Sequence, residues 1–299
     1  MNHTPPRFLP IEVLPTGSLS SLSPALRIAN PSTNFQAVLI RLLTGTINIY
    51  CESTGKVFYQ KNNYALVLYQ TNKRRTSRTV KNVFSSYASM RDVENHLSAS
   101  IRQNNKFYRE ILFEFYNYFL QKNRRNYSAA FLHLYRILES VAYCFPLIWA
   151  SRARDYERTF KKLKGYFIDP KIGELGIFKK FFKDFINPTT VYDVPVTLNI
   201  NSKHPDWQKR YYDVLKANID PTDFISETPN TSIEIKFGGL VDLAIKLRNQ
   251  YFHFLTGQSQ SFTSENIPDT DEFFIIINEL FCNWLAVVFF QLLEFEISS

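Results

Sequence analysis

Glycine and cysteine are scarce in this 299-residue chain, and neither forms a recognisable motif. With 9 glycines, the chain contains neither G-x-G-x-x-G nor G-x-x-x-x-G-K-[ST], the glycine-rich strings that cradle phosphate groups in many α/β proteins. The three cysteines, Cys51, Cys144 and Cys282, lie far apart, which favours a reducing compartment and argues against a zinc site. No two histidines have the H-x-x-x-H or H-E-x-x-H spacing of a metal site. We therefore expect no bound metal and no cofactor.

A targeting segment is also lacking. The N-terminus, MNHTPPRFLPIEVLP, has no apolar run of the kind that a secretory signal peptide needs. The most apolar stretch, residues 281–295, is shorter than the roughly 20 residues that span a bilayer as a helix. The sequence therefore predicts a cytoplasmic protein without a membrane partner.

Aromatic and basic residues are abundant. Phe occurs 27 times and Tyr 17 times, which favours large helices packed through aromatic rings. The net charge of +8 is unevenly distributed, because basic residues outnumber acidic ones by ten to three over 61–110 and by ten to four over 152–183. Residues 257–299 carry seven acidic and no basic residues. Such asymmetry is typical of a protein with one polyanion-binding side, although solvated helix faces would give the same count.

The first 100 residues have the pattern of a small β-rich module. Residues 1–34 are rich in Pro and Ser and show no period. Short β-rich segments separated by turn residues follow, at 36–43, 46–51, 56–59 and 64–69. A basic run over 73–81 comes next, and we interpret it as a linker with RNA-binding residues Lys73, Arg74, Arg75 and Arg78.

From residue 101 to 299 the period is helical, interrupted by a mixed insertion at about 187–236. Apolar side chains at steps of three and four predict one helix through Phe107 to Phe119 and another through Phe131 to Phe145, which Pro146 kinks or ends. Further helices are expected over 152–167, 172–186, 207–217 and about 269–296, with strands at 191–200 and 233–237. The fold class predicted is α+β: a small N-terminal β-rich module followed by a mainly helical bundle.

The most unusual string is LRNQYFHFL, residues 247–255, on a helix expected to begin after Gly238-Gly239. Asn249 and His253 are four residues apart and share one helix face. Arg248 and His253 diverge by about 140° around the axis, so a single helix does not aim both at one point. A long arginine or a second copy of the helix across a two-fold axis could bring the groups together.

Arg248-Asn249-x-x-x-His253 resembles the R-(polar)-x-x-x-H motif of HEPN (higher eukaryotes and prokaryotes nucleotide-binding) ribonuclease domains. An earlier helix of such domains carries an acidic residue in an apolar setting, and Leu134-Tyr135-Arg136-Ile137-Leu138-Glu139-Ser140 is similar to that helix, with Glu139 at the acidic position. The resemblance covers roughly residues 103–298 and implies an all-α bundle with the motif on a late helix.

The resemblance implies a metal-independent endoribonuclease in which the ribose 2′-hydroxyl attacks the adjacent phosphorus. Arg248, Asn249 and His253 would be the catalytic residues, with support from Glu139 and from Tyr251 as a substrate contact. His253 titrates near neutrality and suits proton transfer, whereas Arg248 stays charged and suits phosphate oxygens. The resemblance further implies a homodimer, and a toxin or an abortive-infection effector against phage with an antitoxin or operon partner.

Two other interpretations remain open. The chain could be a non-catalytic HEPN-like module that dimerises or binds a partner protein or nucleotide. In that case Arg248 would pair with a carboxylate such as Asp242 or Glu279. A DNA-binding regulator that uses the 73–81 run is the other alternative, although no helix-turn-helix motif supports it.

Overall fold

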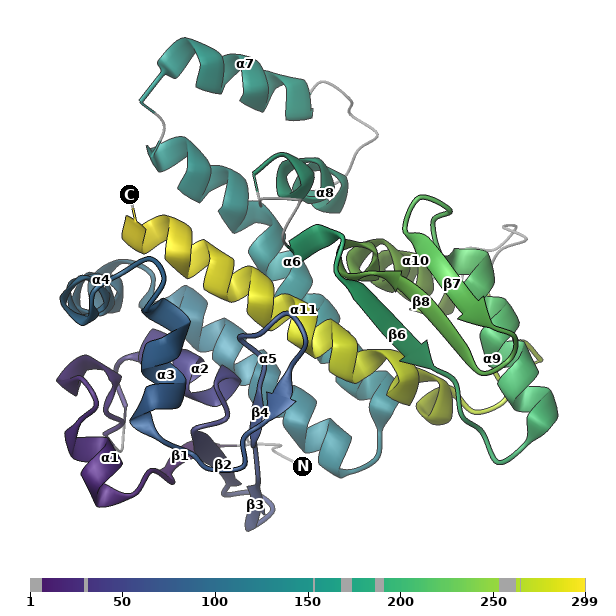
Figure 1. The fold of residues 1–299 in the computed structure, drawn as a ribbon, viewed down its shortest axis with the longest axis horizontal. Coiled ribbons are helices and arrows are strands. Elements are labelled where there is room, and N and C mark those ends of the chain that lie inside the picture. The colour runs from purple at the N-terminus through teal and green to yellow at the C-terminus, as the bar shows by residue number, and fades with distance from the viewer. Residues whose placement is uncertain are drawn as a thin grey trace, which may run out of the picture. The chain divides into compact units, whose positions relative to one another are not determined.

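The computed structural model describes residues 7–29, 32–152, 154–167, 174–185, 191–252, 262–263 and 265–298. Helices account for 62% and strands for 12% of the described residues, in small antiparallel sheets beside a helical bulk, which agrees with the predicted α+β class. Figure 1 labels these helices and strands. The chain divides into two compact units. Unit 1 comprises residues 1–124 and 286–299, and unit 2 comprises residues 125–285. The boundary at residue 100 expected from the sequence stays a prediction.

Unit 1 holds a three-stranded antiparallel sheet in the order β1-β2-β3 and a two-stranded ribbon, β4-β5. The strands are β1 (Phe8–Glu12), β2 (Ile47–Cys51), β3 (Lys56–Phe58), β4 (Asn62–Asn63) and β5 (Gln70–Thr71). The helical elements of this unit before residue 125 are α1 (Thr16–Ser20), the 3-10 turn η1 (Pro24–Leu26), α2 (Phe35–Leu43), α3 (Ser77–Phe84), α4 (Met90–Gln103) and α5 (Asn105–Asn123). The described part of this unit is therefore helical as well as β-rich.

Two of the four predicted strands are confirmed and two are wrong. Residues 47–51 and 56–58 are strands, joined through a turn in which Gly55 has a φ of 64°. Residues 36–43 instead form part of α2. This run is mostly apolar, and periodicity cannot distinguish a buried strand from a buried helix in such a run. The Asn34 side chain accepts a hydrogen bond from the Ala37 amide and begins the helix.

The fourth predicted strand, over 64–69, is a bend between β4 and β5. The interpretation of residues 1–34 as irregular is also wrong in part, since β1 pairs with β2 from Phe8↔Cys51 to Glu12↔Ile47. A five-residue edge strand that contains Pro10 has a weak sequence signal, and its pairing with β2 is a tertiary contact.

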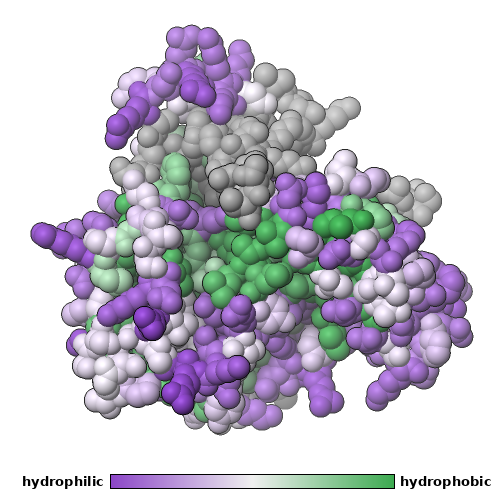
Figure 2. Space-filling view, viewed as in Figure 1, coloured by the Kyte–Doolittle hydropathy of each residue, from purple (hydrophilic) through white to green (hydrophobic). Residues whose placement is uncertain are grey.

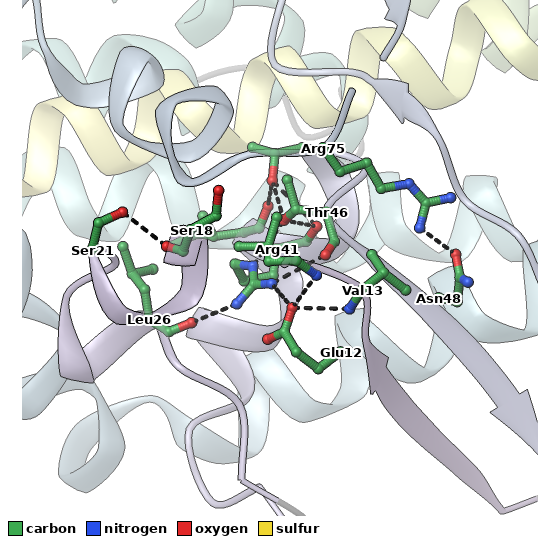
Figure 3. Close-up of polar contacts among 12 residues, drawn as sticks. Glu12, Val13, Ser18, Ser21, Leu26, Arg41, Thr46, Asn48 and Arg75 are labelled. Carbon is green, nitrogen blue, oxygen red and sulfur yellow. Dashed lines mark hydrogen bonds and ion pairs between the residues drawn. The ribbon is translucent and has the colours of Figure 1, made fainter. Parts of the chain in front are cut away.

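A buried arginine ties the elements of unit 1 together (Figure 3). Arg41 on α2 is fully buried and donates to Thr46 Oγ1 at 2.8 Å, the Thr46 carbonyl at 3.1 Å and the Leu26 carbonyl at 3.0 Å. Its Nη2 also lies 2.6 Å from Oε1 of Glu12 at the end of β1. Glu12 Oε1 accepts from the Val13 and Leu14 amides as well. Buried charge of this kind is tolerated because it is paired and hydrogen-bonded.

Unit 2 combines helices with a second antiparallel sheet in the order β6-β8-β7. Its elements are α6 (Tyr127–Arg152), α7 (Tyr156–Phe167), α8 (Glu174–Phe185), β6 (Pro195–Asn199), α9 (Pro205–Asn218), β7 (Phe224–Thr228), β8 (Ser232–Lys236), the 3-10 turn η3 (Phe237–Gly239), α10 (Leu240–Phe252) and the first part of α11 (Thr270–Ser298). The predicted helices and the strands near 191–200 and 233–237 are confirmed to within a few residues. The sequence did not predict β7.

Aromatic rings build the core of unit 2. The Phe131 ring on α6 lies 4.6 Å from that of Phe274 and 5.7 Å from that of Phe281, both on α11. The predicted stripe on α6 is buried from Phe131 to Ala142. The helix continues through Pro146 to Arg152, so it does not end at this proline.

The last helix, α11, extends well beyond the apolar stretch at 281–295 and agrees with the helix predicted over about 269–296. Among the described residues, α11 and the Tyr127–Ile148 part of α6 are long and apolar enough to cross a membrane. Most of that part of α11 is buried within the protein, as in the core helix of a globular protein. Length and composition alone do not distinguish these two kinds of helix, so the cytoplasmic location stays a prediction.

Candidate functional site

The helix that carries the motif begins at two tightly packed glycines. A Cβ on Gly238 would collide with the Tyr192 ring, and one on Gly239 would lie 2.7 Å from the Asp223 Cβ. The Tyr192 hydroxyl donates to Asp223 Oδ1 at 3.0 Å, so these two partners also hold each other. Close backbone approach is therefore the reason for glycine at both positions. From here α10 runs with one face buried and brings Arg248 to its other face.

Arg248 meets the predicted acidic helix, α6. Its Nη2 lies 3.5 Å from Glu139 Oε1, and its guanidinium carbon lies 4.9 Å from the centre of the Tyr135 ring. Tyr135 and Glu139 are four residues apart, so they present adjacent positions on one face of α6. The Arg248 side chain is 23% exposed and that of Glu139 is 45% exposed. Both side chains of this ion pair are therefore partly open to solvent.

Arg248, Glu139 and Tyr135 form what we call the arginine cluster. Burial raises the pKa of Tyr135 to about 12; the Arg248 charge opposes this shift and the Glu139 charge adds to it. The phenol therefore stays neutral at physiological pH and presents a ring face to the cation. Sequence reasoning identified Glu139 but not Tyr135. The i, i+4 spacing of the two residues on an apolar helix was the available signal.

Asn249 is exposed, and its Oδ1 accepts a hydrogen bond from Arg248 Nη1 at 3.2 Å. The amide therefore lies beside the arginine, where it restrains one edge of the guanidinium. The sequence predicts that Asn249 and His253 share one helix face, and His253 lies outside the described residues. The structure describes α10 as far as Phe252, one residue short of the histidine.

Tyr251, predicted as a substrate contact, packs within an aromatic group at the end of α10. Its ring centre lies 4.5 Å from that of Phe252 and 5.3 Å from that of Phe274. Phe252 in turn stacks on Phe131 of α6, with ring centres 6.2 Å apart and planes 6° from parallel. The same Tyr251 also lines a pocket of about 360 Å³ formed with residues 262–263 and 267–270. Packing and pocket lining are therefore both roles of this side chain.

Asp242, one of the two carboxylates considered as a structural partner of Arg248, is paired with another residue. Asp242 lies one to two turns earlier on α10 and forms an ion pair with Lys179 of α8. Its side chain is 10% exposed. Arg248 is paired with Glu139 instead, the carboxylate that the HEPN resemblance singled out.

The predicted RNA-binding run lies in unit 1, around the start of α3. Lys73, Arg74 and Arg78 are exposed, as phosphate contacts need to be. Arg75 is half-buried, and its Nη1 donates to Asn48 Oδ1 at 2.8 Å (Figure 3). Burial lowers the pKa of Arg75 from its ordinary value. This arginine therefore ties the run to β2, and the other three basic side chains face solvent.

Among the described residues, no three His, Cys, Asp or Glu side chains are grouped so as to hold a metal ion. No family model matches the chain, and neither a curated protein nor a solved structure shows significant similarity to it. The function is therefore inferred from the motif and from the arginine cluster.

Proposed function

We propose that the protein is a metal-independent endoribonuclease of the HEPN type. The observation that supports this best is the arginine cluster, in which Arg248 of the motif helix contacts Glu139 of the upstream helix. The two sequence strings on which the resemblance rests are distant in the chain, and they are adjacent at these two side chains. A chance match of two short strings would not require this contact.

The chemistry follows from the residue types. His253 removes the proton from a ribose 2′-hydroxyl, and the 2′-oxygen then attacks the adjacent phosphorus. The bond from phosphorus to the 5′-oxygen breaks, this oxygen takes a proton from water as it leaves, and His253 returns its proton to the solvent. The products are a 2′,3′-cyclic phosphate and a 5′-hydroxyl. Arg248 binds two phosphate oxygens in a fork and stabilises the charge that grows on them. Glu139, Tyr135 and Asn249 hold the guanidinium in place.

The biological role proposed is that of a toxin or an abortive-infection effector, restrained by an antitoxin or operon partner until triggered. The alternative is a non-catalytic HEPN-like module. The partners of Arg248 favour this alternative to a degree, because an arginine with an acidic partner, an aromatic ring and an amide already has a structural role. Loss of activity without loss of stability separates the two functions.

The test is to incubate purified protein with RNA in excess EDTA and to analyse the ends of the fragments. We expect cleavage with 2′,3′-cyclic phosphate ends, and we expect Arg248→Ala and His253→Ala each to lower the rate by at least about a hundredfold. The melting temperature should change by only a few degrees, since Arg248 is partly exposed.

Matched controls are His204→Ala and Arg210→Ala, exposed residues at the start of α9 and within it. Both should cleave at the wild-type rate. A strict requirement for added divalent metal would contradict the proposed mechanism. Intact activity or large losses of stability in both motif variants would favour the non-catalytic module.

A further inference from the structure

Helix α7 presents two aromatic rings to solvent. Tyr156 is 86% exposed and Phe160 is 67% exposed. They are four residues apart, so they lie on one face of the helix, one turn from each other. Most of each ring therefore faces solvent, whereas the rings of Phe178 and Phe181 on α8 are buried. The packing of α7 therefore leaves its aromatic face uncovered.

Basic residues surround these rings. Arg158, Lys161 and Lys164 are exposed on α7, and Arg154 is exposed just before it. The acidic Glu157 is neutralised by Lys161, with Nζ and Oε1 2.6 Å apart. Figure 2 shows mainly hydrophilic residues over α7, at the top of the view. The helix thus combines positive charge with exposed aromatic rings, which together match a polyanion that carries flat apolar groups.

The spacing of the rings suits a nucleobase. Four residues of α-helix advance by about 6 Å along the axis. Stacked bases are about 3.4 Å apart, so a base inserted between two rings needs about 7 Å. Small rotations of the two side chains can widen the ring separation from about 6 Å to about 7 Å. In a duplex the bases are already stacked on one another, so only a single strand offers a free base face.

We propose that α7 is a binding platform for single-stranded RNA, with Tyr156 and Phe160 stacking on bases and the flanking Arg and Lys side chains contacting phosphates. This inference rests on the proposed function for the choice of RNA, and it makes the substrate class single-stranded. Binding itself needs no cleavage and is measured separately. The platform is sequence-tolerant, because every base has a π face.

An anionic membrane surface is the competing partner for a basic amphipathic helix. Such helices insert a broad apolar face of many large side chains. On α7 the described exposed apolar side chains are two aromatic rings, and the next apolar residue on that face, Leu163, is half-buried. The aromatic pair therefore favours a base-stacking partner.

The experiment measures fluorescence anisotropy of a labelled 2′-O-methyl oligouridine, which lacks the nucleophilic hydroxyl and resists this cleavage. The double variant Tyr156→Ser/Phe160→Ser should bind at least about tenfold more weakly, since each base–aromatic stack contributes about 1–3 kcal/mol. The salt dependence should keep its slope, because no charge is removed. Binding to a duplex of the same length should change by less than about twofold.

Two comparison variants complete the design. Tyr59→Ser removes another exposed ring, 74% exposed in unit 1, and should not alter binding. Arg158→Ser/Lys164→Ser should weaken the binding of single strand and duplex alike. It should also flatten the salt slope by about 0.7 for each phosphate of the single strand that these side chains neutralise in the wild-type complex. The triple variant of Lys73, Arg74 and Arg78 to Ser should act in the same way if the run binds phosphates.

Unchanged single-strand affinity of the aromatic double variant would overturn the platform, as would an equal loss for the duplex. A membrane partner would be indicated by flotation with phosphatidylserine vesicles. The inference would also fall if the wild-type protein floated, the double variant did not float, and the double variant kept the wild-type affinity for single-stranded RNA. If no variant or condition gave RNA cleavage but the aromatic pair governed single-strand binding, the platform would stand and the ribonuclease proposal would fail.

Discussion

At the level of single residues, the arginine cluster has an orienting role more than a stabilising one. A partly exposed ion pair contributes about 0–1 kcal/mol, and a cation over an exposed ring contributes about 0.5–1 kcal/mol. These energies are small beside the stability of a domain of this size. They are large enough to restrain the rotamers of a long side chain. Glu139, Tyr135 and Asn249 thus hold Arg248 in one orientation and add little to the stability of the protein.

Glu139→Gln tests this orienting role. We expect the melting temperature to fall by only a few degrees and kcat for RNA cleavage to fall at least about tenfold, with KM changed less. The reason is that the amide keeps the volume but no longer attracts the guanidinium. Asp213→Asn, which removes the exposed Lys209 pair on α9, is the matched control and should alter neither quantity. A lower melting temperature with unchanged kcat would assign Glu139 to stability alone.

At the level of elements, the position of α10 depends on the glycine pair at its start. Gly238 and Gly239 allow the backbone to approach Tyr192 and Asp223, which come from the segments before β6 and before β7. The helix axis that carries Arg248 is therefore set by backbone contacts more than two turns away from it. Gly165, in the same unit, provides a contrast to this pair. Gly165 on α7 has open space where a Cβ would lie.

Gly238→Ala should lower the free energy of unfolding by about 1–3 kcal/mol, because the added methyl group must displace the Tyr192 ring in a packed site. Gly165→Ala should leave stability unchanged or raise it by up to about 1 kcal/mol through helix propensity. Urea denaturation of the two variants beside the wild type provides the measurement. Equal stability of both variants would show that the site relaxes without cost.

Several elements were predictable because their signal is local. The stripe from Phe131 to Ala142 recurs every three or four residues and predicted α6, and the turns at Gly45 and Gly55 were predicted from residue type. Both glycines have a positive φ, of 67° and 64°. Residues 36–43 were not predictable in the same way, because eight consecutive mostly apolar residues fit a buried strand and a buried helix equally well. Packing against α5 and the Asn34 cap decided in favour of α2.

At the level of the whole molecule, the motif geometry favours a dimer. Arg248 and His253 diverge by about 140° on a regular helix, so one copy of α10 does not direct both at one phosphate. Two copies related by a two-fold axis would place two arginines and two histidines around one cleft. We therefore expect the active unit to be a homodimer.

The dimer is tested by measuring cleavage and sedimentation across the same dilution series. Specific activity should fall in proportion to the dimer fraction as the protein dissociates. Mixing Arg248→Ala with His253→Ala protein should restore part of the activity if each site takes one residue from each copy. A fully active monomer, with no restoration in the mixture, would exclude the composite site.

Local sequence was sufficient to predict Arg248 and Asn249 on a late helix and Glu139 on an earlier one, because each depends on residue type and spacing within a single turn or helix. Tertiary packing decided which groups meet. Arg248 pairs with Glu139 and rests on Tyr135, Asp242 pairs with Lys179, and Arg75 is held by Asn48. It also decided that Tyr156 and Phe160 remain exposed among many buried rings. The physical reason is that a side chain's partner and its exposure depend on elements distant in the chain, and periodicity carries no information about these.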